Sequence, residues 1–228
     1  MLYPVLLTTR RFLWLTALLV PLCGLLIVFI DQPLARFCHA HSAGLKPFFG
    51  GFTGAAEVVH EATMKTRLFG IPALFVALVL LYAVGRWLLK LPQASVFLVV
   101  VVAHLASVGT SNVLKGVVSR LRPEVLFSTG YPDWGFNYPH HAHAGSFPST
   151  HTATFFSLFV PLALAFPRLS APLLVVPVLI GVGRLVLEMH YLSDVLFSVW
   201  LVVLFTFLAG QLAHLPLVSG RHAALAEK

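Results

Sequence analysis

The sequence predicts an all-α polytopic membrane protein with six transmembrane helices in one bundle. Of its 228 residues, 58% are hydrophobic and only 10% are charged, and the mean hydropathy is +0.90. These values exceed what the core of a water-soluble domain requires. The apolar residues are concentrated in six long stretches, and no internal repeat or low-complexity stretch stands out. Residues 1–228 are therefore expected to form a single membrane-embedded domain.

Each apolar stretch is about long enough to cross a membrane as a helix. A hydrocarbon layer of about 30 Å takes about 17 to 25 helical residues. The predicted spans run approximately over 12–30, 68–84, 95–114, 152–167, 171–187 and 195–213. The fourth and fifth are short and are interrupted by Pro161, Pro172 and Pro177. The third contains a segment rich in β-branched residues, Val96 to Val102, which could be a buried strand in a soluble protein. A lipid-facing strand outside a closed barrel leaves backbone groups unpaired, so a helix is expected there too.

The first span begins just after Arg10 and Arg11, as the apolar part of a signal peptide does. Its apolar run of about 19 residues is longer than the roughly 7 to 15 residues typical of a signal peptide. The nearest small-residue cleavage site, around Ala40 to Ala43, lies far downstream. An uncleaved membrane anchor is therefore expected.

The basic residues of short loops and chain ends predict the orientation. If six helices alternate across the membrane, these residues fall on one side: Arg10, Arg11, Arg86, Lys90, Arg168, Arg221 and Lys228. The positive-inside rule makes that side cytoplasmic, with both chain termini on it. The remaining basic residues stand in two long loops and in three short polar motifs, which then face outward together.

Charge and cysteine content limit the partners. The formal net charge is +7, but the basic residues stand singly between apolar runs and form no stripe with interleaved aromatic residues. No nucleic-acid partner is therefore expected, whereas an anionic lipid or phosphate fits. Cys23 and Cys38 are expected to be free thiols, because they lie roughly 22 Å apart if one continuous helix joins them.

The first polar motif, KGVVSRLRP, runs from Lys115 to Pro123. Lys115 and Arg122 are two helical turns apart, so both leave one face if the third helix extends to Arg122, and Pro123 then ends that helix. Two cations on one face form a clamp for a phosphoryl group. The alternative is that both are basic residues reaching from a membrane boundary towards water.

The second motif, FPSTH, runs from Phe147 to His151 and precedes an apolar helix. Ser149 or Thr150 is suited to cap that helix, whose first backbone N–H groups form a natural anion site. His151 lies in the first turn, where it can donate a proton to a leaving-group oxygen. A histidine after a helix cap is also compatible with a purely structural role.

The third motif, RLVLEMHYLSD, runs from Arg184 to Asp194. Asp194 follows His190 by four residues, so its carboxylate can accept a hydrogen bond from one imidazole nitrogen and present the other as a base or nucleophile. Arg184 would lie about 120° away from His190 around a straight helix, so a break near Met189 is predicted. A polar cap between two helices is the alternative.

Together the three motifs resemble the signature of the type 2 phosphatidic acid phosphatase superfamily, K-x6-RP, PSGH and SR-x5-H-x3-D. The matching residues are Lys115-x6-Arg122-Pro123, Pro148-Ser149-Thr150-His151 and Gly183-Arg184-x5-His190-x3-Asp194. All spacings within the motifs are kept. Thr150 replaces the glycine of the second motif and Gly183 replaces the serine of the third. Through the six-helix plan, the resemblance covers the chain from about residue 68 onward.

The resemblance implies a metal-independent and cofactor-independent phosphatase. His190 would attack phosphorus and form a phosphohistidine, Asp194 would hold its ring, and His151 would protonate the leaving oxygen. The implied phosphate-binding groups are Lys115, Arg122, Arg184, Ser149 and the Thr150 N–H. The core motifs thus span 115–194.

The implied substrates are bacterial lipid phosphates: undecaprenyl diphosphate, phosphatidylglycerol phosphate, phosphatidate or lipid A phosphate. The implied location is the inner membrane, with the active site facing the periplasm or exterior. Two alternatives stay open: a lipid-linked phosphotransferase and a non-enzymatic transporter of anionic lipids. The sequence does not predict the oligomeric state.

Two long loops complete the interpretation. His140, His141 and His143, with Asp133 nearby, form a possible zinc site, but their loop is expected to cover the active site or meet the lipid headgroups instead. The loop from Asp31 to Arg67 is rich in aromatic residues and glycines. This composition suits either a segment in the membrane interface or an ordinary packed loop. Glu188 is expected to lie near the site, where it could tune the site or simply stand at a helix end. Four further histidines are expected to be packing or interface residues rather than ligands: His39, His41, His60 and His104.

Overall fold

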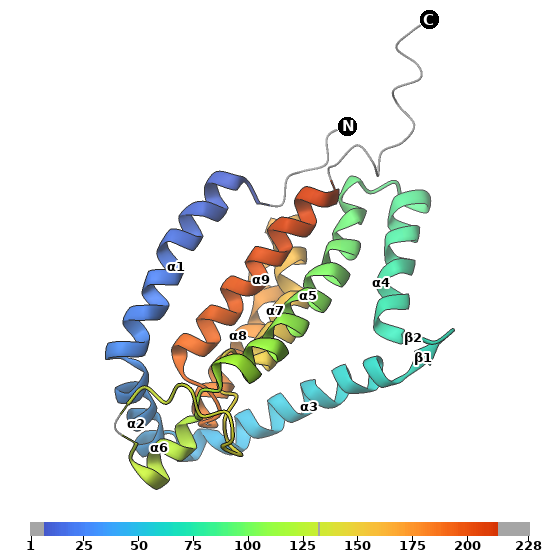
Figure 1. The fold of residues 1–228 in the computed structure, drawn as a ribbon. Coiled ribbons are helices and arrows are strands. Elements are labelled where there is room, and N and C mark those ends of the chain that lie inside the picture. Colours follow the sequence, from blue (N-terminus) through green and yellow to red (C-terminus); the bar gives the residue numbers. More distant parts are fainter. Residues whose placement is uncertain (1–6, 132, 214–228) are drawn as a thin grey trace, which may run out of the picture.

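The computed structural model describes residues 7–131 and 133–213, and this part of the chain is mostly helical (Figure 1). Its α-helices are α1 (Thr9–Phe29), α2 (Asp31–His41), α3 (Lys46–Lys65), α4 (Ala73–Ala83), α5 (Val96–Val118), α6 (Pro123–Thr129), α7 (Thr150–Ala165), α8 (Ser170–Val186) and α9 (Leu192–Ala213). Two short strands, β1 (Arg67–Leu68) and β2 (Ile71–Pro72), pair as an antiparallel hairpin.

The six apolar stretches coincide with α1, α4, α5, α7, α8 and α9, so the predicted all-α class is confirmed. Within the described residues, four segments are long and apolar enough to cross a membrane: Thr9–Phe29, Pro92–Val118, Pro167–Val186 and Leu192–Leu212. Two further helices are apolar but shorter, Ala73–Leu88 and Thr150–Ala165. A count of six spans therefore stays a prediction.

The start of the second predicted span is wrong, because residues 67–72 form the β1–β2 hairpin rather than a helix. Phe69 and Gly70, at its turn, have φ angles of 54° and 80°. Positive φ at both central residues is the conformation of a type I′ turn, one of the two turn types favoured in two-residue hairpins. Pro72 then precedes the first residue of α4, which fits the tendency of proline to stand at helix starts.

The centre of the bundle is built from α5, α7, α8 and α9, with α1 packed on α9 and α4 on α5 (Figure 1). Small residues make this close packing possible: Ala103 on α5 and Ala153 on α7 are fully buried. His104 is also buried, and its Nδ1 lies 3.0 Å from Ser157 Oγ on α7. The predicted packing role of His104 is thus confirmed.

The outer surface of the bundle is apolar, which is the reverse of a soluble protein. On α1, Trp14 is 69% exposed and Leu18 is 63% exposed. Exposed apolar faces of this extent mark a membrane or a protein partner. Together with helix length, they fit a bundle surrounded by lipid.

The segment predicted as a long loop from Asp31 to Arg67 is folded into α2 and α3, so the ordinary-loop alternative is wrong. Figure 1 shows α3 lying across one end of the bundle, at a steep angle to α5 and α9. Phe48 and Val58 on α3 are 58% and 68% exposed, so this helix also presents apolar side chains outward. Its position suits the membrane interface.

Candidate active site

The three polar motifs meet at the end of the bundle where α3 lies (Figure 1). The Lys115 side chain, near the end of α5, donates to the Gly145 carbonyl just before the second motif. The Ser149 backbone N–H donates to the Asp194 carbonyl across 3.4 Å. Contacts therefore link residues that are far apart in the sequence into a single polar centre.

The local geometry of the first motif differs from the prediction. Helix α5 ends at Val118, because Ser119 adopts a left-handed conformation (φ 45°, ψ 49°) and reverses the chain. Arg122 is the N-cap of α6, and Pro123 is the first residue of that helix. The shared helix face for Lys115 and Arg122 is therefore wrong, as is the role of Pro123 as a helix end.

The predicted break in the third motif is confirmed. Helix α8 ends at Val186 and α9 begins at Leu192, and between them Glu188 has a φ of 59°. The Glu188 carboxylate lies 2.5 Å from Lys46 Nζ and 3.1 Å from His39 Nδ1. These contacts from α2 and α3 hold the reversal that places His190 in the centre.

His190 is oriented by a backbone carbonyl. Its Nδ1 lies 2.6 Å from the Ser146 carbonyl oxygen, whereas the Asp194 carboxylate is 3.7 Å away. A carbonyl can only accept, so Nδ1 carries the proton and Nε2 keeps its lone pair. The expected direct hydrogen bond to Asp194 is thus replaced by a bond to Ser146. Burial disfavours the imidazolium and lowers the pKa of His190 to about 4, although Asp194 opposes the shift.

Asp194 is fully buried and well satisfied. Its Oδ2 accepts from Ser146 Oγ at 2.6 Å and from the Tyr191 N–H at 2.9 Å. Its Oδ1 lies 2.6 Å from Arg120. Asp194 therefore acts on His190 both across space and through Ser146, whose carbonyl holds the ring.

Arg120 is a residue that the sequence interpretation missed. It lies in the spacer of the first motif and is fully buried, and its second terminal nitrogen is 2.8 Å from Asp31. Although burial disfavours the charged form, Asp194 and Asp31 raise the pKa of Arg120 above its usual value. Two features of the sequence could have indicated this pair. Arg120 is a cation between the motif positions Lys115 and Arg122, and Asp31 is an acid directly after the first apolar span.

The three predicted phosphate-binding cations stand around the same centre. Arg184 is only 9% exposed, and Arg122 places a terminal nitrogen 3.6 Å from Met189 Sδ. The Nε atoms of Arg122 and Arg184 are buried without a hydrogen-bond partner among the described residues. Buried donors are rarely left unpaired. These two, with Lys115 nearby, are suited to an anion with several acceptor oxygens.

The second motif forms the predicted helix cap. Ser149 Oγ accepts from the Thr152 N–H at 3.4 Å and from Thr152 Oγ1 at 2.9 Å. Since Ser149 accepts in both bonds, its own hydroxyl proton is not used by them. Thr150 Oγ1 donates to Asn112 Oδ1 on α5 at 3.4 Å. The Thr150 side chain thus points to α5 and contributes to helix packing.

His151 is paired with an acid that the sequence did not predict. Its Nε2 lies 3.0 Å from Glu57 Oε1 on α3. Gly183 explains how α3 comes so close. A Cβ at position 183 would lie 2.9 Å from Thr53 Cγ2 and 3.0 Å from Phe49 Cδ1, so the serine of the related signature would require these side chains to shift.

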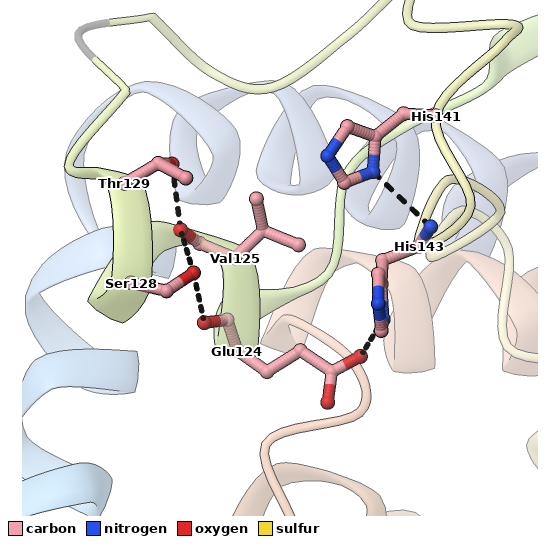
Figure 2. A pocket seen from close by; sticks show the side chains of 6 residues that line it. All are labelled: Glu124, Val125, Ser128, Thr129, His141 and His143. Atoms are coloured by element: carbon pink, nitrogen blue, oxygen red, sulfur yellow. Dashed lines mark hydrogen bonds and ion pairs between the residues drawn. The ribbon is translucent and has the colours of Figure 1, made fainter.

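The histidine loop packs beside this centre without forming a ligand cluster in the described residues. His143 Nδ1 lies 2.7 Å from Glu124 Oε1, and His141 Nδ1 accepts from the His143 N–H at 3.1 Å. Asp133 instead accepts from Gly135 and Tyr138 within the loop. Between α6 and the loop lies a cavity of about 390 Å³ (Figure 2). Its lining is formed by Glu124, Val125, Ser128, Thr129, His141 and His143.

Comparisons with known proteins agree with the resemblance of the motifs. A segment of this chain is 33% identical over 87 residues to a lipid A 1-phosphatase of Rhizobium etli, covering 38% of this chain and 37% of that protein. Another is 31% identical over 98 residues to a lipid A 1-phosphatase of Rhizobium johnstonii, covering 41% and 40%. The matches thus span less than half of the length of these relatives.

The fold also has a solved counterpart. The crystal structure of a transmembrane PAP2 type phosphatidylglycerolphosphate phosphatase from Bacillus subtilis superimposes with a TM-score of 0.52. It is 20% identical and covers 90% of this chain and 96% of that chain, which shows a shared fold. Residues 96–214, more than half of the chain, match the family model of the PAP2 superfamily. The chain therefore belongs to the PAP2 superfamily, as an integral membrane protein.

Proposed function

We propose that this protein is a membrane lipid phosphatase that removes a terminal phosphate through a phosphohistidine at His190. One observation carries the proposal. The Ser146 carbonyl fixes the proton on Nδ1 and leaves Nε2 with a lone pair, beside Arg122 and Arg184, whose Nε atoms are buried without a partner. A protein that only binds or transports anionic lipids needs the cations but has no use for an oriented nucleophile.

In the first step, the Nε2 lone pair forms a bond to phosphorus while the bond from phosphorus to the lipid oxygen breaks. His151 gives its proton to that departing oxygen, which typically accelerates such steps by about 10² to 10⁴. Water then attacks phosphorus, His151 takes a proton from it, and the Nε2–P bond breaks to release phosphate. Lys115, Arg122 and Arg184 bind the phosphoryl oxygens.

The second motif completes phosphate binding in this scheme. The Ser149 hydroxyl and the Thr150 N–H, at the start of α7, donate to the phosphoryl oxygens. The three cations supply the positive charge that a metal ion provides in other phosphatases, so neither metal nor cofactor takes part.

The proposed setting is a bacterial inner membrane crossed six times, by α1, α4, α5, α7, α8 and α9. Both termini are cytoplasmic, and the active site faces the periplasm or exterior. Lipid A 1-phosphate is the first candidate substrate, because both curated relatives are lipid A 1-phosphatases. The other candidate substrates are phosphatidylglycerol phosphate, phosphatidate and undecaprenyl diphosphate.

The test is phosphate release by the purified protein in detergent micelles across these four substrates, with His190→Ala protein as background. We expect release from at least one lipid, unchanged by excess chelator. Transfer to lipid acceptor hydroxyls is followed in parallel, since predominant transfer would make the protein a phosphotransferase. Binding of all four lipids without turnover would contradict the proposal and favour a transporter. A strict zinc requirement would contradict the metal-independent mechanism and favour a zinc site in the histidine loop.

The low pKa of His190 predicts a distinctive pH profile. The nucleophile is neutral above about pH 4, so the single-turnover rate of phosphoenzyme formation should fall only when the pH approaches that value. The phosphate group of the substrate titrates at a second pKa of about 6. Two substrates whose phosphate groups differ in pKa separate titration of the substrate from titration of the enzyme. A fall in rate that occurs at the same pH with both substrates comes from the enzyme. A shared fall near pH 6.5 would contradict the assignment.

A further inference from the structure

The buried cluster of Asp31, Arg120 and Asp194 joins α2 to the proposed catalytic centre. Arg120 places one terminal nitrogen 2.6 Å from Asp194 and the other 2.8 Å from Asp31. The side chains of all three are at most 1% exposed. Asp31 lies outside residues 96–214, the part of the chain that matches the family model.

The cluster is fully hydrogen-bonded around its charges. Asp31 Oδ1 accepts from the Ser193 N–H at 3.0 Å, and its Oδ2 accepts from Ser193 Oγ at 2.5 Å. Phe136 and Tyr191 cover the guanidinium of Arg120, with ring centroids 4.6 Å and 4.2 Å from Cζ. Such cation–aromatic contacts favour the charged guanidinium away from water. This arrangement allows little rearrangement, because each group has its partners in place.

Two carboxylates share one guanidinium, so the ionised cluster carries a net charge of −1. This charge lies next to His190, since Asp194 Oδ2 is 3.7 Å from Nδ1. When Nε2 bonds to phosphorus and Nδ1 keeps its proton, the imidazole ring becomes cationic. A single Arg120–Asp194 pair would be neutral and would offer this cation little stabilisation. With Asp31 sharing Arg120, the charge of Asp194 is not cancelled.

We propose that Asp31 and Arg120 are positioning residues that direct the negative charge of Asp194 towards the phosphohistidine ring. Arg120 fixes the carboxylate and ties α2 to the centre, and Asp31 offsets the charge of Arg120. The inference rests on the proposed phosphatase mechanism. It adds that Asp31, the first residue of α2 and outside the matched family region, influences the rate of phosphoenzyme formation.

The experiment compares Asp31→Asn with the double variant Asp31→Asn/Arg120→Gln. Asp31→Asn keeps the shape of the side chain but makes the cluster neutral, so the rate of phosphoenzyme formation and kcat should fall together. The expected loss is about 10- to 100-fold, the range typical when the outer-shell partner of a metal-bound histidine is mutated. KM and inhibition by inorganic phosphate should stay near wild type, because the phosphate-binding cations are untouched. Folding is expected to survive, since Arg120 still has Asp194 as its partner.

The double variant separates charge from structure. It removes Arg120 as well, so Asp194 alone restores the net charge of −1, held by Ser146 and Tyr191. We expect it to be more active than Asp31→Asn, although below wild type. If the cluster served only stability, the double variant would be the worse of the two, which would overturn the inference. Wild-type kcat in Asp31→Asn would overturn it too.

Ser157→Ala is the matched control, because it removes a buried hydrogen bond between α5 and α7 outside the centre. Its kcat should match wild type even if its thermal stability falls. Loss of phosphate inhibition in Asp31→Asn in parallel with kcat would overturn the inference, since it indicates general damage to the site. Failure of wild-type protein to release phosphate would instead count against the proposed function itself.

Discussion

His190→Ala is expected to lower kcat by about 10⁴-fold or more, the scale seen when a covalent nucleophile is removed from other enzymes. The variant loses the Nε2 atom that bonds to phosphorus. Among the described residues, no other side-chain nitrogen is oriented by the Ser146 carbonyl to take its place. The removed ring is buried, and the close hydrogen bond that it loses among the described residues is the one to the Ser146 carbonyl. The helical bundle should therefore form normally.

Two measurements check this prediction. Phosphate release reports turnover, and acid-quenched protein should contain bound phosphate in the wild type but not in His190→Ala. His190→Ala keeps Lys115, Arg122 and Arg184, so it should still bind inorganic phosphate. This binding can be measured as protection of the variant against thermal unfolding. His41→Ala is the control, since His41 is exposed and its Nδ1 forms a hydrogen bond with the Phe37 carbonyl within α2. Full activity in His190→Ala would show that the nucleophile lies elsewhere.

The helices of the bundle were predictable because each is encoded by a long local run of apolar residues. The same reasoning failed where local signals are weak. Helix α3 contains Gly50, Gly51 and Gly54, which disfavour a helix in isolation. It forms against α8, where Gly183 leaves room for Phe49 and Thr53. That contact joins residues more than a hundred positions apart and has no signature in either segment.

The candidate site divides in the same way. Residues inside the motifs were predicted from spacing, because a fixed separation along a helix or turn limits where their side chains point. The partners Asp31 and Glu57 come from helices that precede the motifs by many residues, and only tertiary packing brings them in. Arg120 was missed for a different reason: the helix was expected to continue past Ser119, so the chain reversal that precedes this side chain was not predicted.

His151→Ala is expected to slow release of the leaving group in a way that depends on its basicity. A lipid alkoxide leaves poorly without a proton, so removal of the acid should cost about 10² to 10⁴ in the first step. An aryl phosphate with an acidic phenol needs little protonation, and its release should be nearly unchanged. The rate of leaving-group release in a single turnover is the measurement, because the later steps do not enter it.

Glu57→Gln is the partner variant. It keeps a group within hydrogen-bond reach of His151 Nε2 but removes the negative charge that stabilises a protonated ring. We expect an effect in the same direction as His151→Ala on lipid substrates, but smaller. An equal loss on lipid and aryl substrates in either variant would indicate a role in phosphate binding rather than in proton transfer.

The same histidine should also control the second half of the reaction. Once the aryl leaving group has departed, water must attack the phosphohistidine and give up a proton, and in His151→Ala the base proposed to receive it is missing. The variant should therefore accumulate phosphoenzyme with aryl phosphates, in amounts that approach the concentration of protein. Because accumulation requires a working nucleophile and a missing base, it would assign separate tasks to His190 and His151 in one measurement, and its absence would leave the proton donor to be sought in another residue.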